Sequence, residues 1–260
     1  MGRQQFISIF AIILVAFFAC AILTAKPESP TRHGGTSRPS AYAAKTAQWA
    51  GNAPDFSGVW MERQEVDALS TSVAPLRPSA EAKFKAAKPG YGPRATPDSQ
   101  DPILSCAPPG VPRIMLLPFP MKIVQTRDEV IMIFEYDHFV RQIHTDRKEH
   151  SKAFDLTWMG DSIGRWEGDT LVVDTVGLND KTWLDQVGHP HSSSLHVIER
   201  LRRIDRNTLE DAITINDPND YTKPWTGTQT FVLKPGWDLS EYVCEDNLKF
   251  LEYHRKEVGK

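Results

Sequence analysis

Two β-rich runs decide the fold: SIGRWEGDTLVVDTVGL (residues 162–178) and LHVIERLRRIDRNTLEDAITI (residues 195–215). Each run has two arms of β-branched and apolar residues around a short polar turn, which is the pattern of a β-hairpin. The turn of the first run is Glu167-Gly168-Asp169, and the turn of the second lies at residues 205–208. The sequence therefore predicts two consecutive antiparallel strand pairs.

The alternation along residues 195–204 favours the wall of a barrel. Successive residues of a strand point to opposite faces. Since neither face of this strand is entirely apolar, we expect a closed barrel whose interior is partly polar. One face carries Leu195, Val197, Glu199, Leu201 and Arg203, and the other carries His196, Ile198, Arg200, Arg202 and Ile204.

Shorter β-rich runs lie on both sides of these hairpins. Residues 122–126 and 130–135 predict another hairpin, residues 139–145 a further strand and residues 228–234 the last strand. The first strand begins near Gly58-Val59-Trp60. Because closure removes exposed strand edges, we predict a mainly β fold, an antiparallel up-and-down barrel of about eight strands. A sandwich of two sheets is the alternative.

The N-terminus carries a long apolar segment. Residues 6–25 are uncharged and follow Arg3. A bilayer-spanning helix needs about 20 apolar residues, more than the roughly 7–15 of a signal peptide. We therefore expect an uncleaved membrane helix, with a cleaved signal as the alternative.

Composition changes divide the rest of the chain. Pro, Ser, Thr, Ala and Gly dominate the segment after the apolar run, which is typical of a flexible linker. Residues 243–256 predict a short C-terminal helix. The expected parts are an anchor or signal (1–25), a linker (26–52), a first strand plus Pro-rich extension (53–121) and the barrel with its C-terminal helix (122–260).

Charge and cysteine content restrict the possible functions. The net charge of −3, with both signs intermixed, gives no basic footprint for nucleic acid. Outside the apolar run the cysteines are Cys106 and Cys244. In an exported domain this pair predicts a disulfide between the Pro-rich extension and the C-terminal tail. Two unpaired buried thiols are the alternative.

The sharpest polar feature is the loop that contains Asp185, His189 and His191. In an extended segment residues i and i+2 face the same way, so both imidazoles can converge on one point. An aspartate bonded to a histidine fixes its tautomer and raises its basicity, which a general base needs. A metal site or simple loop capping are the alternatives, and no nucleophile motif stands nearby.

Further polar and aromatic residues are candidates for contact with a ligand. An inward arginine near histidines suits a carboxylate, and aromatic walls suit an apolar molecule. A solvated outer face and ordinary core packing are the alternatives. The candidate ligand-binding residues are Tyr136, His138, Arg141, His144, Arg165, Trp183 and His196.

Six motifs between Phe56 and about Cys244 resemble an uncharacterised family of exported bacterial proteins. The general look is similar to lipocalin-like (calycin) barrels, which mostly bind small hydrophobic molecules. The resemblance implies a location on the periplasmic side of the inner membrane, or secretion if the signal is cleaved. The motifs are Ser57-Gly-Val-Trp60, Lys88-Pro-Gly-Tyr-Gly-Pro-Arg94, Gly164-Arg-Trp-Glu-Gly-Asp169, Thr182-Trp-Leu-Asp185, Gly188-His-Pro-His-Ser192 and Tyr221-Thr-Lys-Pro-Trp225.

Three functions follow as hypotheses. The first is a membrane-anchored domain that binds a small, partly apolar molecule, with the loop of His189 and His191 at the entrance. The second is a non-catalytic accessory subunit of a membrane protein complex, held by the N-terminal helix. The third is a cofactor-free hydrolase, lyase or isomerase that uses Asp185 with His189 or His191. The sequence assigns no metal site and identifies no cofactor.

Overall fold

The computed structural model describes residues 53–152 and 155–247, which belong to one compact unit. The predicted anchor (1–25), the predicted linker (26–52) and most of the predicted C-terminal helix lie outside the described residues. Across the described ranges, no helix has both the length and the apolar character that crossing a bilayer requires.

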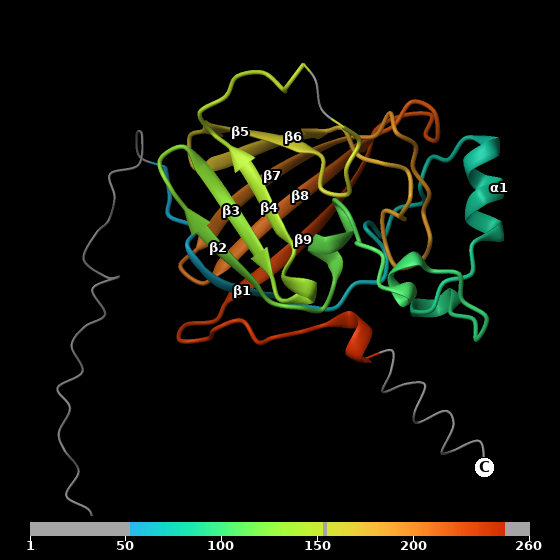
Figure 1. Ribbon diagram of the computed structural model, residues 1–260. Coiled ribbons are helices and arrows are strands. Elements are labelled where there is room, and N and C mark those ends of the chain that lie inside the picture. The colour runs from blue at the N-terminus through green and yellow to red at the C-terminus, as the bar shows by residue number, and fades with distance from the viewer. Residues whose placement is uncertain (1–52, 153–154, 248–260) are drawn as a thin grey trace, which may run out of the picture. The chain divides into compact units, whose positions relative to one another are not determined.

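The described chain forms a closed barrel in which each strand pairs with the next and the last returns to the first (Figure 1). The predicted β-barrel is thus confirmed, although it has nine strands and not eight. The strands are β1 (Gly58–Glu62), β2 (Met121–Gln125), β3 (Glu129–Phe134), β4 (Val140–His144), β5 (Asp161–Glu167), β6 (Thr170–Val176), β7 (His196–Asp205), β8 (Thr208–Asn216) and β9 (Trp225–Leu233).

The seam between β4 and β5 departs from the predicted up-and-down pattern. These strands are parallel, and only two residue pairs form their ladder: Ile143 with Ser162, and His144 with Ile163. All other neighbours are antiparallel. A parallel pair needs a crossover connection, which the chain between β4 and β5 supplies in place of a tight turn. The seam is therefore the least extensively paired junction of the barrel wall.

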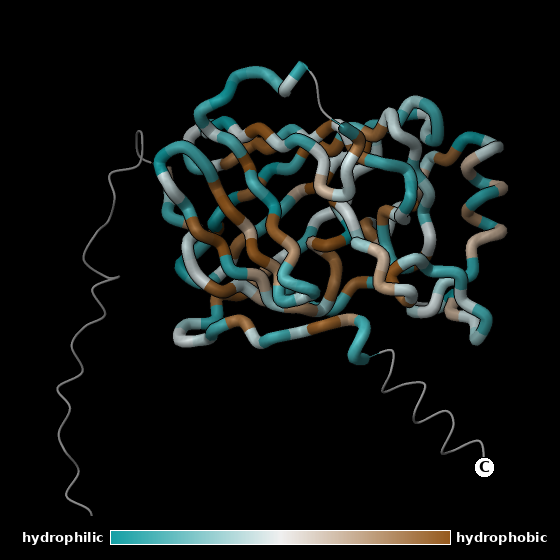
Figure 2. The backbone as a smooth tube through the Cα atoms, in the orientation of Figure 1, coloured by the Kyte–Doolittle hydropathy of each residue, from teal (hydrophilic) through white to brown (hydrophobic). Residues whose placement is uncertain are grey.

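Apolar residues run along the strands (Figure 2). Their buried side chains form one core cluster, and Ile103, Leu117, Tyr136 and Cys244 form a second, smaller one. Alternation sets the direction of each side chain, and the inward positions of β7, Val197, Glu199 and Leu201, are fully buried. Glu199 is accompanied inside by the buried Arg141 and Asp211. The expectation of a partly polar interior is therefore confirmed.

The segment between β1 and α1 packs against one end of the barrel. An ideal Cβ at Gly227 would lie 1.7 Å from the Leu69 carbonyl oxygen, so only glycine allows this approach. Helix α1 (Pro78–Ala86) then begins after Arg77, with a proline at the first helical position and no side-chain cap.

Short 3-10 helices and a disulfide organise the Pro-rich extension. Cys106 and Cys244 lie at bonding distance, with Sγ atoms 2.15 Å and Cα atoms 5.7 Å apart, which confirms the predicted pair. The bond joins the extension to the C-terminal tail. The 3-10 helices are η2 (Gly92–Arg94), η3 (Pro102–Ser105), η4 (Arg113–Leu116) and η5 (Tyr136–His138).

Candidate functional site

An apolar pocket of about 220 Å³ lies beside the barrel, where the Pro-rich extension meets the C-terminal tail. Its walls come from segments far apart in the sequence, among them η3, η5 and the chain around the disulfide. Apolar pockets with a few convergent polar groups are the usual form of a small-molecule site. The lining residues are Glu65, Tyr91, Ile103, Leu104, Leu117, Pro118, Phe119, Tyr136, Gln186, Tyr242, Cys244 and Asn247.

Three aromatic rings form one wall of this pocket, which we call the aromatic pocket. The Phe119 ring lies 4.6 Å from the Tyr242 ring and 5.3 Å from the Tyr136 ring, with edge-on geometry in both pairs. Tyr136 and Tyr242 are 5.3 Å apart and nearly stacked. Such pairs stabilise each other beyond the area they bury, so the wall is preformed.

The local backbone and the disulfide hold this wall in place. Asp137, directly after Tyr136, has a left-handed backbone with φ of 50°, and its carboxylate accepts a hydrogen bond of 2.7 Å from the Cys244 amide. Burial raises the pKa of Tyr136, so its phenol stays protonated. The pocket therefore presents a neutral hydroxyl within an apolar wall.

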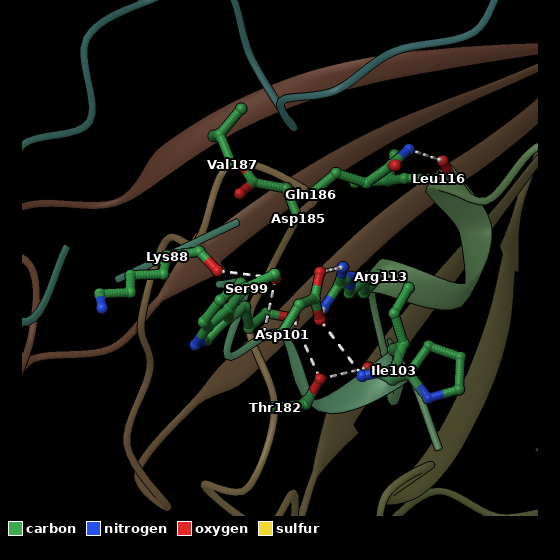
Figure 3. A network of polar contacts seen from close by, with 12 residues as sticks. Lys88, Ser99, Asp101, Ile103, Arg113, Leu116, Thr182, Asp185, Gln186 and Val187 are labelled. Carbon is green, nitrogen blue, oxygen red and sulfur yellow. Dashed lines mark hydrogen bonds and ion pairs between the residues drawn. The ribbon is translucent and has the colours of Figure 1, made fainter. Parts of the chain in front are cut away.

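Gln186 contributes a polar side chain to the aromatic pocket. Its Nε2 donates to the carbonyls of Val66 at 3.3 Å and Leu116 at 3.4 Å, as Figure 3 shows for Leu116. The amide plane is thereby fixed, and Oε1 remains as an acceptor for a donor group of a ligand. The exposed Glu65 adds a carboxylate to the lining.

A buried ion pair supports the extension that carries the pocket. Arg113 donates from Nη1 to Asp101 Oδ1 at 2.7 Å and from Nη2 to Oδ2 at 2.5 Å, and both side chains are fully buried (Figure 3). The Ile103 amide also donates to Asp101, at 3.2 Å. One cation thus balances one carboxylate, and the pair positions η3 beside the pocket.

The structure brings Asp185 and His189 together as predicted. His189 Nδ1 lies 2.6 Å from Asp185 Oδ2, and the same carboxylate accepts from the Leu69 amide at 3.0 Å. The His189 ring stacks on Phe84 at 4.4 Å and packs against Trp225 at 4.8 Å. The carboxylate therefore ties two chain segments together at the barrel end and fixes the imidazole orientation.

His191 does not share this contact. Its Nδ1 donates to the carbonyl of Ser192 at 3.2 Å, and its Nε2 is buried without a hydrogen-bond partner among the described residues. Burial lowers the pKa of His191, which favours the neutral ring. The two imidazoles of the loop thus have separate environments, and the loop is packed into the protein with both rings nearly buried.

The predicted ligand-binding residues do not form one site. Tyr136 lines the aromatic pocket, and Arg141 and His144 line a separate hollow of about 250 Å³ between β4 and β5. Arg165 is exposed on the outer surface. The others are dispersed: His138 is exposed on η5, Trp183 packs near Arg113, and His196 bonds to Asp174.

A chain of histidine and aspartate side chains on the outside of the barrel was not predicted from the sequence. Asp174 Oδ1 lies 2.6 Å from His196 Nε2 and 2.9 Å from His150 Nε2, while His150 Nδ1 lies 3.0 Å from Asp161. The period-two spacing on β5 and β6 contained no signal for it, because His150 arrives from the crossover connection.

Within the described ranges, no group of three histidine, cysteine or acidic residues is placed to hold a metal ion.

No protein-family model matches this chain, and no curated protein is significantly similar to it. The closed barrel agrees with the lipocalin-like look of the sequence. The resemblance to exported bacterial proteins stays an expectation from the motifs alone.

Proposed function

We propose that this domain binds a small, partly apolar molecule in the aromatic pocket. The observation that carries the proposal is the preformed wall of Phe119, Tyr136 and Tyr242 around a space of about 220 Å³. This places the ligand beside the barrel, whereas the loop of His189 and His191, the expected entrance, is packed at the barrel end.

The lining restricts the chemistry of the ligand. A flat apolar ring matches the aromatic wall, and a hydrogen-bond donor on that ring matches the free Oε1 of Gln186. The volume suits a molecule of one or two rings. Indole has both features, one apolar double ring and one N–H, and is therefore a suitable probe.

Calorimetric titration with indole tests the proposal in matched variants of the full-length protein. Leu104→Trp adds bulk at the pocket wall and should abolish binding, whereas Leu104→Ala widens the pocket and should leave it able to bind. Trp237→Ala, which removes an aromatic ring that is 52% exposed and outside the pocket, is the control. Equal affinity in the wild type and Leu104→Trp would exclude the pocket as the binding site.

A second candidate function is acid–base catalysis by Asp185 and His189. The 2.6 Å contact favours it, because a bonded carboxylate holds the proton on Nδ1 and leaves Nε2 as a base. Hydrolysis of 4-nitrophenyl acetate is a direct assay. Saturable activity that is lost in His189→Gln and kept in His191→Gln would support this function, and equal rates in all three proteins would exclude it.

A further inference from the structure

The barrel interior contains a fully buried arginine, Arg141, in addition to Arg113 outside the barrel. Arg141 on β4 donates from Nη1 to Glu199 Oε1 at 2.8 Å and from Nη2 to Oε2, across the barrel to β7. Its remaining donors point at Ser162 and Thr175, at 3.4 Å and 3.0 Å. Arg141 is 1% exposed and Glu199 is not exposed at all. The cation is therefore bound by one carboxylate and two hydroxyls.

A second carboxyl group lies in the same interior without a partner. Asp211 on β8 is completely buried, and neither of its carboxyl oxygens has a hydrogen-bond partner among the described residues. Its cross-strand neighbours are Leu201 on β7 and Gln229 on β9. Glu199 pairs with Ile213 in the same ladder, so it lies diagonal to Asp211 on the same buried face of the sheet. The Gln229 side-chain amide donates to Glu62 on β1 at 3.1 Å, and it makes no hydrogen bond with Asp211.

An ionised Asp211 would be a buried charge without a donor or a free cation. Such a charge costs several kcal/mol, and proteins avoid the cost by neutralising the group. The charged groups that act on Asp211 are Glu199 from β7 and Arg141 from β4, and Arg141 already balances Glu199. The hollow between β4 and β5 is lined by Arg141 but not by Asp211, so it offers no route for a counter-ion.

We propose that Asp211 and Glu199 share one proton inside the folded barrel at neutral pH. Asp211 carries the proton and donates it to the Glu199 carboxylate, whose other contacts come from Arg141. This arrangement neutralises Asp211 and gives its carboxyl group a hydrogen-bond partner with no additional atom. It is independent of ligand binding in the aromatic pocket.

The electrostatics agree with this geometry. Burial and the neighbouring Glu199 carboxylate raise the pKa of Asp211 well above its usual range, against the opposing effect of Arg141. The pKa is raised in the folded state, so the stabilisation is complete below the unfolded pKa and is lost as pH rises toward the folded value. The barrel should therefore lose stability as pH rises above the pKa of an aspartate in the unfolded chain.

Infrared spectroscopy in D₂O at neutral pH tests the proposal directly, since a protonated carboxyl has a C=O band separate from those of carboxylates. The full-length protein should show this band, and ¹³C labelling of aspartate side chains should shift it. Asp211→Asn should remove it, whereas Asp238→Asn, at a side chain that is 93% exposed, should keep it.

A missing band in the wild-type protein would overturn the proposal, as would a spectrum in which aspartate labelling shifts no part of the band, since Glu62 alone supplies a part that this labelling leaves in place. The labelling arm needs no variant, so the test stands even if Asp211→Asn does not fold. Glu62 is the other carboxyl group of this region whose pKa is raised. Glu62→Gln removes its contribution to the spectrum, and the aspartate band should persist in that variant.

Discussion

The two fully buried arginines in the described part of the chain lie in opposite electrostatic situations. Arg113, outside the barrel, faces the single carboxylate of Asp101. Arg141, inside it, faces Glu199 and has Asp211 nearby as a second carboxyl group. The first site is balanced without a proton, and the second is balanced only with one. The comparison teaches that equal burial of a salt bridge predicts neither its pH dependence nor the effect of removing its acid.

The largest expected effect comes from breaking the balanced pair. Asp101→Asn leaves Arg113 as a buried charge without a counter-ion, so the free energy of unfolding at pH 7 should fall by about 3–5 kcal/mol. Urea unfolding measures it. Asp238→Asn, an exposed counterpart, should change stability by less than about 0.5 kcal/mol. An Asp101→Asn protein with an unchanged free energy of unfolding would show that the two sites do not differ as described.

The same substitution inside the barrel should have the opposite sign. Asp211→Asn keeps a donor toward Glu199 and removes the ionisable group, so it should stabilise the protein at pH 8 by about 1–3 kcal/mol. The gain should shrink toward pH 5, because keeping the folded wild-type carboxyl protonated costs less free energy at a pH closer to the pKa of the unfolded chain. Urea unfolding at both pH values measures this gain, and a destabilised variant at pH 8 would contradict the placement of a proton on Asp211.

Glu62 gives a smaller effect of the same sign. Burial, with a lesser contribution from the Glu65 carboxylate, raises the pKa of Glu62 to about 7. Its contribution to stability is present below the unfolded pKa and is lost as pH rises toward 7. Glu62→Gln should therefore reduce the loss of stability between pH 5 and pH 8 by about 1–2 kcal/mol. Parallel pH profiles of the two proteins would refute this.

The smallest effect should come from an exposed pair. Lys85 and Glu81 form an ion pair at i,i+4 on α1, with side chains that are 71% and 50% exposed. Water and salt screen such a pair, so Lys85→Ala should change the free energy of unfolding by less than about 0.5 kcal/mol. A loss comparable to that of Asp101→Asn would mean that burial is not what separates these pairs.

Much of the barrel followed from the sequence. Alternation along residues 195–204 predicted a partly polar barrel interior, because the composition of each strand face is a local pattern, and the structure places Glu199 inside. The parallel seam of β4 and β5 did not follow, since the path of a crossover connection depends on tertiary packing. All nine strands lie on runs that the sequence marked as β-rich, and only the stated total of about eight was wrong.

The candidate sites were less predictable. The Asp185–His189 contact was expected, but the convergence of His191 was not confirmed by its contacts. Convergence of the two rings requires an extended loop, whereas Gly188 has φ of +93° and the Pro190 carbonyl accepts a hydrogen bond from the Tyr221 hydroxyl. The aromatic pocket combines segments that no spacing rule connects, and only the cysteine pair indicated that two of them meet.

Native mass spectrometry of the full-length protein, purified from its own source, tests the proposed function most directly. The wild-type protein should carry a small-molecule adduct, and Leu104→Trp should lack it while Trp237→Ala retains it. An unliganded wild-type protein that also fails to bind indole, or an adduct that Leu104→Trp keeps, would contradict binding in the aromatic pocket.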